Sequence, residues 1–339
     1  MTHSLAPLAP GEFLARVVAD HGVACELMSE HGRDRACLLP TTRLDPTGPS
    51  RPAAGDWVIT ARGVGDPPLS IVAILPRRTC MVRQGTGLAT REQVIASNID
   101  TVFVVASMNK DLNVNRIERL LAAVQGGGAQ AVVVVHKADL DLGAGPAVRH
   151  RLAEVEARTP VVFTSVVTEG GLAPLDPFLG PGETVALVGS SGVGKSTLVN
   201  HLLGVDAQVT QSQRLDDDRG RHTTVGRALF VMPDGRGVLV DTPGMRELAL
   251  WSGDGLSEAF ADVTDLMTQC RFRSCTHQGE DGCAVAEAIT EERLSERRWE
   301  NHRKLEREAE WMAQRKSRSQ RHKGRAFSKH IRSLKKHAW

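Results

Sequence analysis

A glycine-rich stretch near the middle of the chain carries the strongest chemical signal in the sequence. Residues 189–197 read Gly-Ser-Ser-Gly-Val-Gly-Lys-Ser-Thr and match the phosphate-loop pattern G-x-x-x-x-G-K-[ST]. An apolar run, 185–188, precedes the loop and a helical pattern follows it, which is the context that this motif requires. The expected nucleotide-binding residues are Gly189, Ser190, Ser191, Gly192, Val193, Gly194, Lys195, Ser196 and Thr197.

The residue types in this loop indicate the chemistry. Its glycines let backbone N–H groups curve around phosphate oxygens, and the helix that follows adds a favourable field for anions. We expect Lys195 to reach the β- and γ-phosphates and the Ser196 hydroxyl to ligate Mg²⁺. The sequence therefore predicts a site for a nucleoside triphosphate and magnesium.

Two segments beyond the loop complete this pattern. Asp241 ends an apolar strand and begins D-x-P-G, so its carboxylate is expected in the Mg²⁺ shell and the Gly244 amide at the γ-phosphate. The polar segment 215–226 lies between the phosphate loop and this strand. One of its threonines, Thr223 or Thr224, is expected to complete the Mg²⁺ coordination, and the sequence does not decide between them.

A base-recognition motif stands upstream of the phosphate loop. Directly after the apolar run 131–135 come His136, Lys137, Ala138 and Asp139, close to the guanine-specific pattern N-K-x-D but with His in place of Asn. The aspartate of this pattern accepts hydrogen bonds from guanine N1 and N2, so we expect a preference for GTP and GDP. Because histidine replaces the asparagine, we expect the affinity to be weakened. Ser165 follows the next strand, where GTPases contact guanine O6.

The order of these motifs is base recognition, phosphate loop, then the two switch segments. Apolar strands alternate with helical patterns through this region, which predicts a largely parallel sheet covered on both faces. A sheet can form from a different chain order, provided that each strand takes the same position and the original ends are joined. The order of the motifs here resembles that of a circularly permuted GTPase.

A cluster of soft ligands lies further along the chain. Cys270, Cys275, His277 and Cys283 form the pattern C-x4-C-x-H-x5-C. Three thiolates and one imidazole make a closed tetrahedral set for one Zn²⁺, with no open position for a reactive water. We therefore expect a structural zinc ion that stabilises a small domain.

Charge is distributed unevenly along the chain. The net charge is +2, yet after Glu310 there are ten Lys and Arg residues and no acidic one. A cationic tail suggests a polyanionic partner, although a disordered solubilising tail would have the same composition. The sequence shows no apolar run long enough to span a membrane and no signal-peptide pattern at its beginning, so we expect a cytoplasmic protein without a membrane partner.

The fold expected from these patterns has several domains. Candidate strands at 36–39, 57–60 and 70–75 indicate a small N-terminal β-barrel, for which an oligonucleotide-binding (OB) barrel would fit. The central part is an α/β phosphate-loop domain and the C-terminal part a helical zinc-binding domain, in which helices are expected over 284–298 and 300–314. The expected division is a barrel at 1–76, a linker at 77–95, a circularly permuted GTPase domain at 96–248, a zinc-binding helical domain at 249–314 and a disordered basic tail at 315–339.

Together, the barrel, the permuted motifs and the Cys3His pattern resemble the RsgA-type GTPases of small ribosomal subunit biogenesis. The resemblance implies a GTP hydrolase stimulated by the small subunit, acting late in its maturation, with both flanking domains touching ribosomal RNA. The catalytic set is then Lys195, His222, Asp241 and Gly244. Met245 stands where Ras-like enzymes place a glutamine, so the resemblance assigns the positioning of water to His222.

Two alternatives remain open at this stage. One is an RNA-binding assembly protein whose nucleotide is mainly structural, which Lys195→Ala would separate from an enzyme by turnover. The other is a permuted GTPase that serves another ribonucleoprotein particle. In either case we expect a monomer.

Overall fold

The computed structural model describes residues 8–43, 51–63, 68–84, 92–108, 112–141, 143, 145–204, 228–241, 248 and 253–314. The chain forms two compact units. The first comprises residues 1–81, 94–117 and 128–246, and the second residues 82–93, 118–127 and 247–339. In the part of the chain that the structure describes, no helix combines the length and the apolar character needed to cross a membrane.

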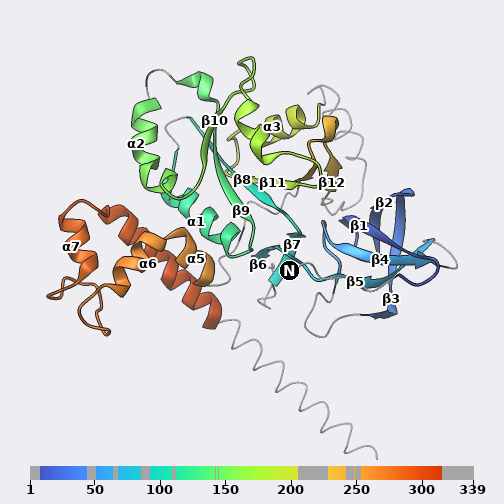
Figure 1. Ribbon diagram of the computed structural model, residues 1–339, viewed down its shortest axis with the longest axis horizontal. Coiled ribbons are helices and arrows are strands. Elements are labelled where there is room, and N and C mark those ends of the chain that lie inside the picture. Colours follow the sequence, from blue (N-terminus) through green and yellow to red (C-terminus); the bar gives the residue numbers. More distant parts are fainter. Residues whose placement is uncertain are drawn as a thin grey trace, which may run out of the picture. The chain divides into compact units, whose positions relative to one another are not determined.

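The N-terminal strands of the first unit close into a barrel, drawn in blue in Figure 1. They are β1 (Glu12–Asp20), β2 (Ala24–Ser29), β3 (Gly32–Arg43), β4 (Trp57–Arg62) and β5 (Leu69–Ile74). Their order is β1-β2-β3-β5-β4, with β3 parallel to β5 and β1 antiparallel to β4. The expected barrel is confirmed. Its first two strands were absent from the sequence expectation, because charged residues such as Arg16 interrupt their apolar pattern.

A six-stranded sheet forms the rest of the first unit, in the order β10-β9-β8-β11-β13-β12. Its strands are β8 (Thr101–Ser107), β9 (Gln130–His136), β10 (Val161–Thr164), β11 (Thr184–Gly189), β12 (Ala228–Val231) and β13 (Val238–Asp241). All neighbours pair in parallel except β12 with β13. Every residue of β8 and β11 is buried, as expected for a sheet covered on both faces.

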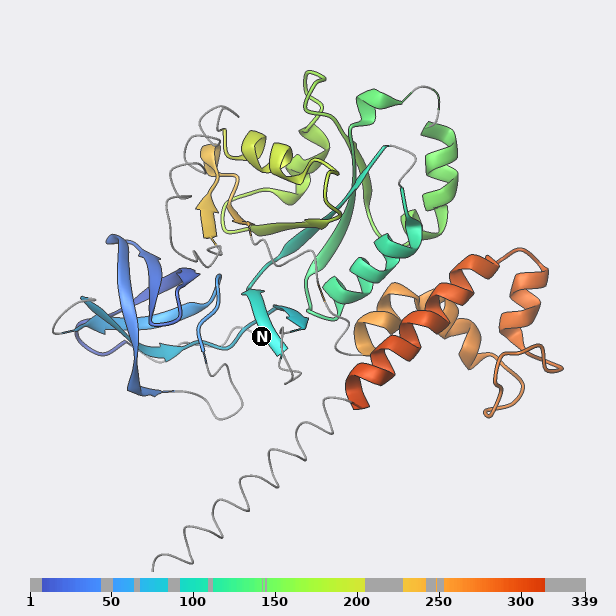
Figure 2. The same ribbon diagram turned by 180° about the vertical axis from the view of Figure 1, so that it is seen from behind.

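Helices cover this sheet on both sides. Figures 1 and 2 show α2 (Gly145–Glu156) on one face and α3 (Lys195–Leu202) on the other. Buried apolar side chains such as Phe103, Leu187 and Leu198 pack between α3 and the strands. The remaining helices of this region are α1 (Val114–Gln125) and the short 3₁₀ helices η1 (Ala138–Leu140), η2 (Ala173–Phe178) and η3 (Pro233–Gly235).

The segment expected to be a linker, 77–95, contains regular structure. Strand β6 (Cys80–Gln84) and strand β7 (Glu92–Ser97) pair in a separate two-stranded sheet. Both strands are short and their polar side chains lack clear alternation, so the sequence pattern did not reveal them.

The C-terminal part of the second unit is helical, as expected. It contains α5 (Gly253–Ala259), α6 (Ala261–Thr268), α7 (Ala284–Thr290) and a final helix over residues 296–314. One expectation is corrected, because the helix expected over 284–298 is two helices. Glu292 has a φ of 58°, which ends the first, and the Ser295 hydroxyl accepts a hydrogen bond from the Arg298 N–H to cap the second.

A buried ion network stabilises the second unit. Glu118 and Arg298 are each 1% exposed, and Glu118 Oε1 accepts a 2.8 Å hydrogen bond from Arg298 Nη1. Arg297 and Asn301 also donate to the Glu118 carboxylate, at 2.9 Å and 2.6 Å. Arg298 completes its own set with two bonds to Asp262. Burial of these charges is therefore matched by hydrogen bonds on both sides.

Candidate nucleotide and metal sites

The phosphate loop follows the fully buried strand β11 and leads directly into α3. The first residue of the loop must be glycine, because a Cβ on Gly189 would lie 2.3 Å from the Val105 carbonyl oxygen of the neighbouring strand β8. Gly194 has a φ of 101° and precedes the first residue of α3. The loop thus has the curvature that exposes backbone N–H groups, and it stands at the carboxyl edge of the parallel strands.

Lys195 lies over the loop from which it projects. Its ammonium group donates to the carbonyl oxygens of Gly189 at 2.9 Å and Ser190 at 2.5 Å. The cationic end of the side chain is therefore held at the concave side of the loop. Ser196 and Thr197, the next two expected ligands, are exposed in the first turn of α3.

The base-recognition motif lies at the same edge of the sheet, at the end of β9. Lys137 adopts a left-handed conformation, with a φ of 60°, and its ammonium group donates to the Gly192 carbonyl of the phosphate loop at 3.2 Å. Asp139 accepts a 2.5 Å hydrogen bond from the Ser165 hydroxyl. The structure thus brings the upstream motif and the phosphate loop together, although more than fifty residues separate Lys137 from Gly192 along the chain.

His136 is the residue of this motif that departs from the guanine-specific pattern, and it is 1% exposed. Its Nδ1 lies 3.2 Å from the Thr164 hydroxyl on β10. Burial lowers the pKa of this imidazole, and the positive charge of Lys137 lowers it further. His136 therefore stands as a neutral ring between two strands.

The structure describes only some of the remaining expected ligands. Asp241 is the last residue of β13, so its carboxylate stands at the same carboxyl edge as the phosphate loop. His222, Thr223, Thr224 and Gly244 lie outside the described residues, and their expected roles stay predictions.

One arginine at the phosphate loop was not anticipated. Arg116 of α1 donates from Nη1 to the Ser190 hydroxyl at 2.6 Å. The sequence offered only a basic residue on a predicted helix, and nothing in that pattern indicated a contact with residue 190. The hydroxyl at this loop position is therefore oriented by a helix that follows β8.

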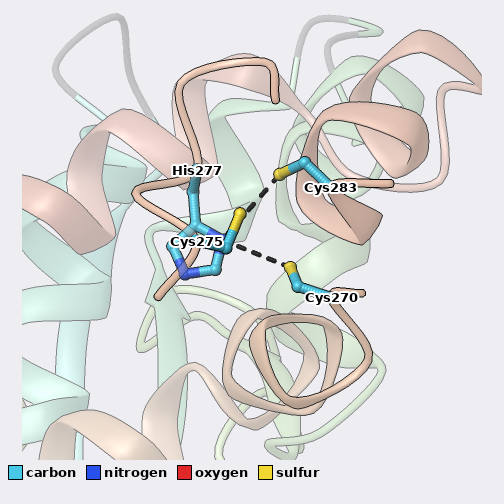
Figure 3. A group of neighbouring side chains, drawn as sticks. All are labelled: Cys270, Cys275, His277 and Cys283. Atoms are coloured by element: carbon cyan, nitrogen blue, oxygen red, sulfur yellow. Dashed lines mark hydrogen bonds between the residues drawn. The ribbon is translucent and has the colours of Figure 1, made fainter. Parts of the chain in front are cut away.

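The four expected zinc ligands converge between α6 and α7. Figure 3 shows the three sulfur atoms and the His277 imidazole directed at one another. The ligand atoms of Cys270, Cys275, His277 and Cys283 all lie within 4.8 Å of one another. Cys283 is buried at the N-terminus of α7 and the other three are half-buried.

The spacing of these atoms suits a tetrahedral ion. His277 Nδ1 lies 3.4 Å from the Cys270 sulfur and 3.8 Å from the Cys283 sulfur. A zinc ion with tetrahedral Zn–S and Zn–N bonds of ordinary length separates S and N by about 3.6 Å. Burial raises the pKa of the Cys275 thiol to about 12, and the hydrogen bonds with the Cys283 and Cys270 thiols act in the same direction. A cation at the centre would reverse this preference, so the donor set fits zinc.

Comparison with known proteins agrees with this architecture. The RsgA GTPase family model matches residues 74–251. A protein of Opitutus terrae named small ribosomal subunit biogenesis GTPase RsgA is 44% identical over 324 residues, covering 91% of this chain and 87% of the relative. A protein of Methanosarcina acetivorans with the same name is 42% identical over 298 residues, covering 87% and 79%.

Two solved structures share the fold. The crystal structure of YjeQ from Thermotoga maritima has a TM-score of 0.65 at 25% identity, covering 88% of this chain and 98% of that one. YloQ, described as a circularly permuted GTPase, has a TM-score of 0.62 at 20% identity, covering 92% and 99%. The permuted order expected from the motifs is thus confirmed as a known fold. On the match of its family model and the identity to its relatives, the chain belongs to the RsgA GTPase family.

Proposed function

We propose that this chain is a Mg²⁺-dependent GTP hydrolase that acts as a switch in late maturation of the small ribosomal subunit. Its family is one of GTPases, and the relatives at 44% and 42% identity are named for small ribosomal subunit biogenesis. We further propose that its partner is the small ribosomal subunit with its RNA, and that the protein acts as a cytoplasmic monomer.

The observation that carries this proposal is the meeting of two motifs at one edge of the sheet. Lys137 of the base loop donates to Gly192 of the phosphate loop, and Ser165 orients Asp139. In this proposal Asp139 accepts from guanine N1 and N2, while the phosphate loop binds the other end of the same nucleotide. A guanine nucleotide is the ligand whose two ends match these loops.

The residues of the site have different roles toward GTP and Mg²⁺. Lys195 neutralises charge on the β- and γ-phosphates, and the phosphate-loop amides bind their oxygens. Ser196, Asp241 and one of the threonines Thr223 and Thr224 would hold Mg²⁺, which supplies further charge neutralisation at the transferring phosphate.

The switch residues connect this site to hydrolysis. The Gly244 amide would contact the γ-phosphate, and His222 would orient the attacking water, since Met245 offers no hydrogen-bonding side chain. Both positions lie in segments whose order is expected to depend on the γ-phosphate. Low intrinsic turnover, raised when the ribosomal subunit orders these segments, follows from this arrangement.

The flanking regions are assigned to recognition. The cysteine cluster would hold one structural Zn²⁺ through Cys270, Cys275, His277 and Cys283. The division into a barrel at 1–76, a linker, a GTPase domain at 96–248, a zinc-binding domain at 249–314 and a basic tail is part of the same proposal. Ribosomal RNA is the polyanion that the barrel, the zinc domain and the cationic tail would contact.

Hydrolysis of GTP by the purified chain, with and without small ribosomal subunits, tests this function. ATP and large subunits serve as controls, and Lys195→Ala is the variant expected to abolish turnover. Stimulation by small subunits alone supports the proposal. Nucleotide-dependent RNA binding without turnover would favour an assembly protein with a structural nucleotide, and stimulation by another particle would reassign the partner.

A further inference from the structure

His136 occupies a position in which its side chain has little freedom. It ends β9, directly before Lys137, and only 1% of its surface is exposed. On one side of the ring, Nδ1 lies 3.2 Å from the hydroxyl of Thr164, the last residue of β10. Because β9 and β10 pair in register at these two residues, the contact joins the carboxyl ends of the two strands.

The opposite edge of the ring lies against the phosphate loop. A Cβ on Gly194 would be 2.4 Å from Cδ2 and 3.0 Å from Nε2 of His136, so only glycine leaves room for this ring. Gly194 immediately precedes Lys195, which contacts the phosphates under the proposed function. The histidine ring therefore lies in direct contact with the phosphate loop.

The charges around His136 favour the neutral ring. Burial lowers its pKa, Lys137 on the base loop lowers it further and His201 on α3 acts in the same direction, while Asp139 on η1 and a backbone hydrogen bond at Thr164 raise it. The folded protein therefore binds a proton here less readily than an ordinary imidazole. The stabilisation from the neutral ring is complete above the ordinary pKa of 6.5 and is lost progressively as the pH falls below it.

We propose that His136 is a positioning residue whose neutral imidazole clamps the base-binding loop onto the phosphate loop, so that affinity for guanine nucleotides decreases in weakly acidic solution. This inference rests on the proposed GTPase function, since it concerns how the guanine site of this chain is assembled. A GTPase with asparagine at this position has no titrating group in the clamp and lacks this dependence.

The dissociation constant for GDP, measured on the full chain at pH 7.5 and pH 5.5, tests the clamp. The wild-type constant is expected to rise at the lower pH by less than about tenfold, which is the limit for a group that titrates at the ordinary imidazole pKa, one unit above pH 5.5. His136→Asn keeps a polar group for Thr164 and should show a much smaller rise. The phosphates of GDP titrate equally with every variant, so the ratio between wild type and H136N isolates the imidazole.

Three further variants complete the design. His136→Ala should weaken GDP binding at both pH values. Thr164→Val removes only the hydroxyl and should weaken binding less, and it still tests the contact if H136A does not fold. His201→Gln is the matched control, because it removes the neighbouring imidazole without touching the clamp. It should keep a clear pH dependence, shifted slightly to higher pH since one charge that lowers the His136 pKa is gone.

Different outcomes would exclude the clamp and the GTPase function. A wild-type chain that binds GDP at pH 7.5 with a pH dependence identical to that of H136N would overturn the clamp and leave the GTPase function intact. GDP binding by T164V as tight as that of the wild type would also count against the clamp. A wild-type chain that binds no guanine nucleotide at pH 7.5 would overturn the proposed function itself.

Discussion

The nucleotide site and the Cys3His cluster are both built from side chains distant in sequence, yet they are held in place by different means. Around the nucleotide loops, protein groups hold one another: His136 contacts Thr164, Ser165 donates to Asp139 and Lys137 donates to Gly192. These residues follow strands that are largely buried. The base loop and the phosphate loop are therefore held together by protein groups.

The cysteine cluster lies in a chain segment of turns and bends between two short helices. Three of its ligands are half-buried, and His277 has a φ of 58°. Its local hydrogen bonds centre on the Glu280 carboxylate, which accepts from the N–H groups of Thr276 and Gln278. With so little apolar burial around it, this loop would depend on the Zn²⁺ proposed for it. The comparison indicates that the nucleotide loops are positioned by the sheet, whereas the cysteine loop would be positioned by a bound ion.

The largest expected effect is the loss of metal from the cluster. Chelation, or Cys275→Ser, should unfold residues 261–299 because structural zinc contributes on the order of 10 kcal/mol to folding. Hydrogen exchange measured along the chain should accelerate there while β8 and β11 keep their protection. Cys37→Ser, at a half-buried cysteine outside the cluster, is the control. Unchanged exchange after verified metal removal would contradict a metal-dependent fold.

The second effect concerns the buried ion network of the same unit. Glu118→Gln removes the charge that three donors share and leaves Arg298 buried with only Asp262 as an acidic partner. Breaking such a pair costs about 3–5 kcal/mol, so thermal unfolding should shift to clearly lower temperature.

An exposed ion pair provides the matched control for that variant. Glu291 and Arg293 are both more than half exposed, and Glu291→Gln should change stability by less than about 1 kcal/mol. Equal effects of E118Q and E291Q would show that the buried network does not stabilise the unit.

The smallest effect concerns the base loop of the nucleotide site. Ser165→Ala removes the hydroxyl that orients Asp139, a hydrogen bond to a charged group worth about 1.5 kcal/mol, or roughly tenfold in GDP affinity. Titration of labelled GDP measures it, with Thr168→Ala, an exposed side chain in the same loop, as the control. If S165A binds GDP like the wild type, Asp139 is held by other contacts and the site is less dependent on this bond than proposed.

Much of the fold could be predicted because its signals are local. The buried strands β8, β9 and β11 are continuous apolar runs, and burial on both faces of a parallel sheet requires that pattern. The strands β1 and β2 were missed because charged side chains break their apolar runs. Arg16 is nevertheless buried in β1, since its guanidinium donates to Gly55 and Thr184. Likewise, the break at Glu292 in the expected helix over 284–298 depends on a single backbone conformation that carries no strong sequence signal.

The sequence by itself determined the chemistry of this protein: the phosphate loop, the K-x-D of the base loop and the spacing of the zinc ligands are residue types whose function depends on short-range order along the chain. Only the tertiary structure decided which groups meet. The ring of His136 against Gly194, Arg116 at Ser190, and Glu118 with Arg298 each join residues from distant segments. Such contacts depend on side-chain length and burial at the place where strands and helices converge, and neither quantity is contained in the spacing of a motif.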